Sequence, residues 1–264
     1  DALARQNGRQ NAPQGADEHP PAGMLRFPDV SDRHIVFVYA NDLWIVDRDG
    51  GDATPLASPA GQELYPRFSP DGKHIAFVGN YEGGRDIYTV PLAGGVPRRV
   101  THHPTGELLA DWTESNGLLF AAGGMGEYPR EAELFTVSSE GGLPVKLPVP
   151  YGGYGAISPD GEWLAYLPHQ RDFRTWKRYR GGMASDIWLY NLRTGETRRL
   201  TDWEGTDSFP MWNGEDLYYL SDRGDEHRLN IWRWNSRTDE HEQVTRFTDY
   251  DVKFPAIGPG ERRG

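Results

Sequence analysis

The stretch from Tyr65 to Thr101, YPRFSPDGKHIAFVGNYEGGRDIYTVPLAGGVPRRVT, predicts four short strands joined by turns. Its SPDG segment, Ser69 to Gly72, is a turn signal because proline presets φ, aspartate bonds nearby backbone and glycine accepts a positive φ. Four antiparallel strands in these 37 residues have the length typical of one blade of a β-propeller. The run Ile75 to Val78 is apolar without alternation, so both faces of this sheet require cover by similar sheets.

The same pattern recurs along the chain. An acidic or amide residue followed by an aliphatic and an aromatic residue marks the third strand at Asp42, Asp86, Glu133, Asp186 and Asn230. An aliphatic residue lies fourteen positions after each of them, so the last hairpin keeps one length. The first strand carries a residue that is usually aromatic and usually precedes proline, at Phe27, Tyr65, Leu109, Tyr154, Phe209 and Phe254. We therefore predict an all-β propeller with five complete blades plus the first strand of a sixth, and six blades when intact.

Composition agrees with this fold and excludes some functions. The 264 residues are 37% hydrophobic and include 32 Gly and 20 Pro, which suits many short strands joined by turns. A net charge of −11 argues against a nucleic-acid surface, which needs a basic footprint. The chain has no cysteine, and no apolar run approaches the ~18 residues of a membrane span, so we expect neither disulfides nor a membrane partner.

Two regions follow from the distribution of large apolar residues. Residues 1–23 contain almost none, and we expect them to form a disordered tail or a linker. We expect residues 24–264 to form the β-propeller, truncated in blade six.

The sequence contains no recognisable catalytic centre. It has no GxSxG, HExxH or GxxxxGK[ST] motif, and Ser69 and Ser158 belong to the SPDG turns of the repeat. We interpret Asp42, Asp86 and Asp186 as bonding nearby turn backbone, because their repetition is typical of packing. We therefore predict no catalytic residue, no metal site and no cofactor.

Unit four contains a long insertion, PHQRDFRTWKRYRGGMAS, between Leu167 and Asp186. It concentrates cations and aromatic residues in an otherwise acidic chain. One interpretation is a solvated loop whose cations pair with neighbouring carboxylates. The other is a contact for peptide or an adjoining domain, because arginine offers bidentate geometry to anions. The candidate contact residues are Arg171, Arg174, Trp176, Lys177, Arg178, Tyr179 and Arg180.

This insertion also carries a family resemblance. The segment WKRYRGG, from Trp176 to Gly182, and the following DIWLYNLRTGETRRLTDWEGTD resemble the amino-terminal propeller of the tricorn protease family. The opening LRFPDVSDRHIVFVYANDLW is similar to that family's first blade, and the resemblance extends from about Met24 to Pro259.

The resemblance implies a large cytoplasmic serine peptidase that assembles into hexamers, with a six-bladed first propeller and catalytic residues in later domains. This chain is then expected to be a non-catalytic propeller that controls substrate access or binds peptides for proteolysis. Its expected partners are peptide substrate, downstream protease domains and further copies of the protein. SPDG and DIW repeats also occur in TolB-like interaction propellers, which are periplasmic, and in prolyl-oligopeptidase-like enzymes. Both remain alternatives, and an exported protein is compatible with the lack of cysteine.

Overall fold

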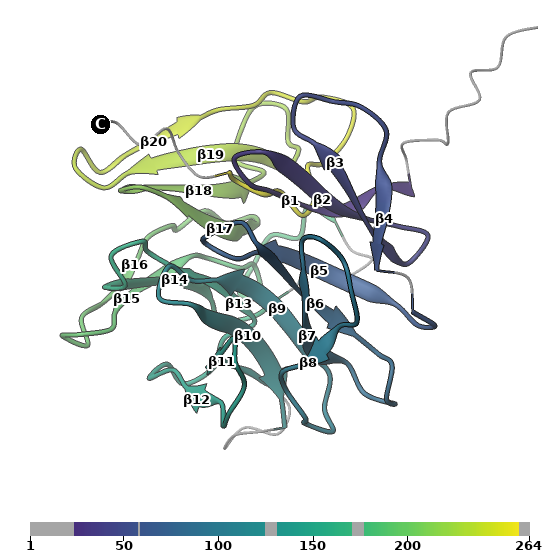
Figure 1. Ribbon diagram of the computed structural model, residues 1–264. Helices are drawn as coiled ribbons and strands as arrows, with labels where there is room; N and C mark the ends of the chain where they lie inside the picture. Colours follow the sequence, from purple (N-terminus) through teal and green to yellow (C-terminus); the bar gives the residue numbers. More distant parts are fainter. Residues whose placement is uncertain (1–23, 58, 125–130, 171–176, 259–264) are drawn as a thin grey trace, which may run out of the picture.

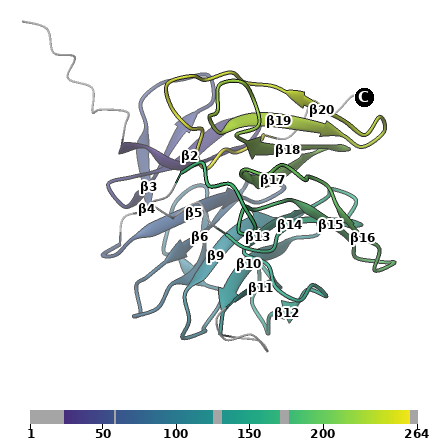
Figure 2. The ribbon, with the colours of Figure 1, turned by 180° about the vertical axis from the view of Figure 1, so that it is seen from behind.

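The structure, a computed structural model, describes residues 24–57, 59–124, 131–170 and 177–258. These residues form twenty strands in five antiparallel four-stranded sheets, and they contain no α-helix. The sheets, which we number blades one to five in chain order, are arranged around a common centre as in a propeller (Figures 1 and 2). The all-β prediction and the prediction of five complete blades are confirmed.

Each blade is a simple meander in which consecutive strands pair. The strands are β1 Arg26–Val30, β2 His34–Tyr39, β3 Asp42–Asp47 and β4 Thr54–Ala57 in blade one; β5 Glu63–Phe68, β6 His74–Gly79, β7 Asp86–Pro91 and β8 Arg98–Arg99 in blade two; β9 Glu107–Trp112, β10 Gly117–Gly123, β11 Ala132–Ser138 and β12 Val145–Lys146 in blade three; β13 Tyr154–Ile157, β14 Trp163–Leu167, β15 Trp188–Asn191 and β16 Thr197–Arg199 in blade four; and β17 Asp207–Asn213, β18 Asp216–Ser221, β19 Asn230–Asn235 and β20 Glu240–Gln243 in blade five.

The SPDG turn forms as its residues predict. The Gly72 N–H donates to the Ser69 carbonyl at 2.8 Å, and the φ of Gly72 is 67°. The Ser69 hydroxyl donates to Asp71 and accepts from the His74 N–H, so it is engaged in the turn. Ser158 has the same role, because its hydroxyl accepts from the Trp163 N–H at 2.9 Å.

The second strands are buried on both faces. In β6, Ile75, Ala76, Phe77 and Val78 are each 0% exposed, which confirms that the sheet lies between two similar sheets. The apolar side chains divide into one cluster across blades one to three and another across blades three to five. Leu108 and Phe254 pack against both clusters, so the two cores are continuous around the centre.

We expected the acidic residues at the start of the third strands to bond turn backbone, but Asp86 and Asp186 form ion pairs with arginine side chains. Asp86 forms an ion pair with Arg99 at 2.8 Å, and Asp186 forms one with Arg199 at the same distance. Glu133 and Lys146 make the equivalent pair in blade three. The cation lies thirteen residues after the acid, on the neighbouring fourth strand, because the constant length of the last hairpin brings these two positions together. A buried carboxylate needs such a charged partner more than it needs a turn N–H.

The residues predicted as the first strand of a sixth blade carry no strand ladder. The Val252 N–H donates to the Leu229 carbonyl at 2.8 Å, which ties the segment to the loop before β19. Phe254 nevertheless occupies the position that the repeat assigns to it. Its ring lies 4.6 Å from that of Phe27 and 5.2 Å from that of Phe209, between blades one and five.

Candidate functional site

Aromatic side chains of the first strands close the centre of the propeller. The ring centroids of Phe27 and Tyr65 are 4.5 Å apart, and those of Tyr154 and Phe209 are 4.9 Å apart. Phe254 lies between Phe27 and Phe209, and Leu108 of blade three lines the small space among these rings. We call these six residues the central plug. The space left among them is about 10 Å³, no more than about one water molecule fills.

The backbone of the first strands is bent where these aromatic residues occur. Phe27, Tyr65, Phe209 and Phe254 all have positive φ, between 49° and 55°. The register of β1, β5 and β17 shifts at the same points. A positive φ is strained for a bulky residue, and β-bulges redirect side chains. The bend therefore aims the rings at the propeller axis.

A funnel of about 690 Å³ opens on one side of the central plug. Its walls are the ends of the first strands and the turns that lead to the second strands. The residue two positions after each of the six aligned first-strand positions, Phe27, Tyr65, Leu109, Tyr154, Phe209 and Phe254, lines the funnel, and we call this set the funnel ring. It consists of Asp29, Arg67, Asp111, Ala156, Met211 and Ala256.

Arg67 bridges three blades at the base of the funnel. Its Nε donates to the Ala110 carbonyl at 2.8 Å, and its Nη2 donates to the Tyr154 hydroxyl at 3.1 Å. Its Nη1 donates to the Pro66 carbonyl at 2.8 Å. Burial lowers the pKa of this group, but Tyr154, Asp29 and Asp111 more than offset that effect and raise it above its ordinary value. The guanidinium is thus a fixed positive charge held by blades two, three and four.

Asp29 and Asp111 lie on either side of Arg67 in the funnel ring. Asp29 accepts a hydrogen bond from the Phe68 N–H of the next blade at 2.7 Å. The backbone N–H groups of Trp112 and of Ile157 in the next blade favour the ionised form of Asp111 and lower its pKa. Burial raises the pKa of each carboxyl to about 6, and the attraction of Arg67 opposes this rise. Asp29 therefore links blades one and two, and both carboxylates stay largely ionised at neutral pH.

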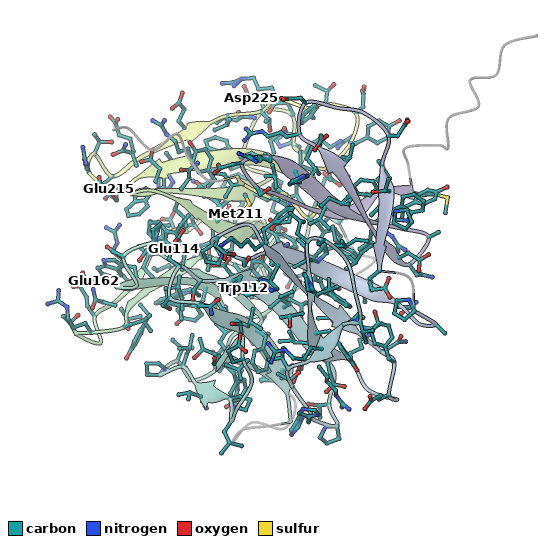
Figure 3. All side chains as sticks on the ribbon, viewed as in Figure 1. Trp112, Glu114, Glu162, Met211, Glu215 and Asp225 are labelled. Carbon is teal, nitrogen blue, oxygen red and sulfur yellow. The ribbon has the colours of Figure 1, made fainter. Side chains whose placement is uncertain are left out.

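The opposite wall of the funnel is apolar. It contains Ala156, Met211, Trp212 and Ile257, and Trp212 donates through Nε1 to the Ala156 carbonyl at 3.2 Å. Figure 3 shows Trp112 and Met211 near the middle of the ring of blades, with Glu162 and Glu215 at its periphery. The funnel is thus charged along blades one to three and apolar along blades four and five.

The predicted contact residues of the blade-four insertion lie toward the other side of the propeller. In a meander, the connection between the second and third strands is at the end opposite to the first turn. Arg171, Arg174 and Trp176 lie outside the described residues. Among the described ones, Lys177 pairs with Asp251 at 3.3 Å, and Arg178 donates to the His227 carbonyl at 3.0 Å. The Arg180 guanidinium lies 3.5 Å from Asp222 and 4.6 Å from the centre of the Trp203 ring. The described end of the insertion, from Lys177 to Arg180, therefore packs against blade five and the segments that flank it, and Tyr179 remains partly exposed.

These contacts predict how alanine substitutions in the insertion affect association and stability. Replacing Arg174, Lys177 and Arg180 by Ala should weaken salt-dependent association with peptide or an adjoining domain, each exposed contact contributing about 1 kcal/mol or less. The Arg180→Ala variant alone should also lower the melting temperature, because it removes the ring contact with Trp203. Titration at low and high salt tests the first effect, and thermal unfolding tests the second. Unchanged association at both salt concentrations would leave the insertion as a clasp on blade five.

Sequence reasoning missed the funnel ring. The signal was present, because each funnel residue stands two positions after a first-strand position that the repeat had already aligned. Asp, Arg and Asp at consecutive repeats break the repeat pattern, and such breaks mark positions that packing alone does not dictate. Within the described ranges, no group of three or more His, Cys, Asp or Glu side chains is placed to hold a metal ion, and no helix is long and apolar enough to cross a membrane.

The fold and the funnel define a class: a propeller built from SPDG and DIW repeats, with a central plug and a blind funnel. The profile of the family described as the tricorn protease N-terminal beta propeller domain matches residues 22–261. The chain belongs to this family, as its resemblance predicted.

Individual relatives of the chain are also named as tricorn proteases. The chain is 30% identical over 212 residues to "Tricorn protease homolog 1" of Streptomyces coelicolor, covering 79% of this chain and 20% of that protein. It is 33% identical over 243 residues to "Putative tricorn protease homolog 2" of the same organism, covering 87% of this chain and 20% of that protein. A crystal structure of the tricorn protease superposes with a TM-score of 0.75 at 24% identity, over 88% of this chain and 23% of that one. The chain thus spans about a fifth of the length of these relatives.

Proposed function

We propose that this chain is the non-catalytic propeller of a tricorn-like serine peptidase and that it serves proteolysis by receiving peptides in its funnel. The observation that carries the proposal is the funnel itself, a cavity of about 690 Å³ that is closed at its base by the central plug. Cavities of 300–1,000 Å³ with apolar walls and a few convergent polar groups are typical ligand sites. Family membership supplies the substrate class, because the matched relatives are named as proteases.

The closed base supports one of two forms of this role. An open channel would let peptides pass along the axis, whereas the central plug leaves room for about one water molecule. We therefore favour peptide binding and selection in the funnel over passage through it. The downstream protease domains, the hexameric assembly and the cytoplasmic location remain part of the proposal, with family membership as their support.

Filling the funnel tests this function. The Ala256→Trp variant places a large ring at the funnel base and should reduce peptide affinity by at least about tenfold, because the ring competes for the same volume. Isothermal titration with a set of unmodified tripeptides measures the effect. Ala93→Trp, at an exposed turn outside the funnel, is the matched control and should bind as wild type does.

The same samples should show no peptide hydrolysis above buffer. Among the described residues, the Thr105 hydroxyl lies 2.8 Å from the His103 ring nitrogen, but no carboxylate is hydrogen-bonded to that imidazole to orient it as a base. If wild type binds none of the peptides at millimolar concentration, or if Ala256→Trp binds them unchanged, the funnel is not a peptide site.

A further inference from the structure

We infer that the funnel selects peptides that carry a primary ammonium group next to an apolar side chain, with the ammonium held at Asp29 and Asp111 and the side chain on the opposite wall. This inference rests on the proposed function and names its ligand class. It follows from the uneven distribution of charge around the funnel.

Charge in the funnel is confined to one half. Every charged side chain among the described lining residues comes from blades one to three, and none comes from the lining segments of blades four and five or from residues 255–258. Carboxylates outnumber cations there by five to three. One of these cations, Lys73, pairs with Asp71 at the rim, 3.5 Å away. The charged half therefore attracts a positive group and repels a free carboxylate.

The base of this half has unused capacity for a cation. Arg67 directs one donor from each of its three nitrogens to Ala110, Pro66 and Tyr154. No ion pair joins Asp29 or Asp111 to Arg67 or to another cation in the part of the chain that the structure describes. Asp29 is held in place by the backbone N–H of Phe68 in the next blade, and Asp111 lines the funnel one blade beyond Arg67. An ionised carboxylate has about four acceptor positions, so each can still bind an ammonium.

The apolar half of the funnel determines which side chain is favoured next to the ammonium group of the ligand. Met211 and Trp212 offer a polarisable and aromatic surface, and Ala156 and Ala256 leave space in front of it. A ligand with charge at both ends would lose hydration on this wall without gaining a partner. Placing a leucine or phenylalanine side chain on this wall contributes favourable binding free energy, because it removes apolar surface from water.

The test compares the binding affinities of one tripeptide, leucyl-leucyl-phenylalanine, with free and with blocked end groups. Isothermal titration measures them, as does tryptophan fluorescence, to which Trp112 and Trp212 in the funnel lining contribute. Acetylation of the amino terminus should weaken binding about tenfold, whereas amidation of the carboxyl terminus should leave it equal or tighter. An ammonium can come from the amino terminus of the peptide or from a lysine side chain, and N-acetylated lysyl-leucyl-phenylalanine carries only the second. If this peptide keeps the affinity of the free tripeptide, a side-chain ammonium suffices. If it loses that affinity, the amino terminus is required.

The protein variants Asp29→Asn and Asp111→Asn keep an oxygen for the backbone N–H donors and lose the charge. Each should weaken the free peptide about tenfold and leave the acetylated peptide unaffected. Glu215→Gln removes a carboxylate from the periphery and should change neither affinity. If free and acetylated peptides bind alike, or if amidation is the change that abolishes binding, this inference is wrong while peptide binding in the funnel stands. If no peptide binds, the proposed function fails with it.

Discussion

Replacing Glu63 by glutamine should remove much of the loss of stability that wild type suffers between pH 5 and pH 8. Glu63 is fully buried between blades one and two, where it accepts from the Leu43 N–H at 3.1 Å and from the Tyr81 hydroxyl at 2.6 Å. Burial raises the pKa of this carboxyl to about 7, and the nearby charge of Asp42 adds to the rise. Glutamine keeps an acceptor for Leu43 and has no charge to bury.

The sign follows from proton linkage. Below pH 4.5 the carboxyl is protonated in both the folded and the unfolded chain, so it costs the folded state nothing. Between pH 4.5 and about 7 the unfolded chain releases its proton first, and the free energy of unfolding falls as the pH rises. By about pH 8 the penalty is complete, on the order of 3 kcal/mol. Glu63→Gln should therefore match wild type near pH 5 and exceed it by about that amount at pH 8.

Urea unfolding at pH 5 and pH 8 measures this difference. Glu107, whose pKa is raised to about 7, and Asp207, whose pKa is raised to about 6, titrate in both proteins, so their contributions cancel. Glu162→Gln, at the periphery, serves as the control and should keep the wild-type pH dependence. Parallel curves for wild type and Glu63→Gln would show that Glu63 is not buried in its charged form at neutral pH.

Removing a ring from the central plug should be the most destabilising of the changes considered. Phe27 is 6% exposed and packs against Tyr65 and Phe254, so Phe27→Ala should cost about 3 kcal/mol or more in unfolding free energy. It should also join the funnel to the small space beneath it. Phe27→Gly should be more stable than Phe27→Ala by about 1 kcal/mol, because the φ of 50° at this position strains alanine and not glycine.

Phe77 provides the matched comparison. It is 0% exposed in β6 and has no positive φ, so there Phe77→Gly should be less stable than Phe77→Ala by about 0.5–1 kcal/mol. Chemical unfolding of the four variants gives the two differences. The inference that the plug is built on strained backbone requires the order of Gly and Ala to reverse between the two positions, and the same order at both would contradict it.

Much of the fold was predictable because its rules act within about 40 residues. The SPDG turns, the apolar run of β6 and the third-strand signatures are local patterns, and repetition made each copy support the others. Even the alignment of the six first-strand positions, from Phe27 to Phe254, followed from the sequence, although in blade three it is the neighbouring Leu108 that lines the centre. The family followed from one segment, Trp176 to Gly182, that the repeat does not require.

Tertiary structure alone decided the contacts between blades. Arg67 meets Tyr154, which is 87 residues away, and Asp29 meets the backbone of Phe68, 39 residues away. No local pattern encodes such distances, since they depend on how many sheets close the ring and how each is rotated. The same closure brings Phe254 against Phe27 and lays Lys177 and Arg180 on blade five. The sequence determined the blades and their order, whereas ring closure determined the plug and the charged half of the funnel, because only packing brings residues so far apart along the chain together.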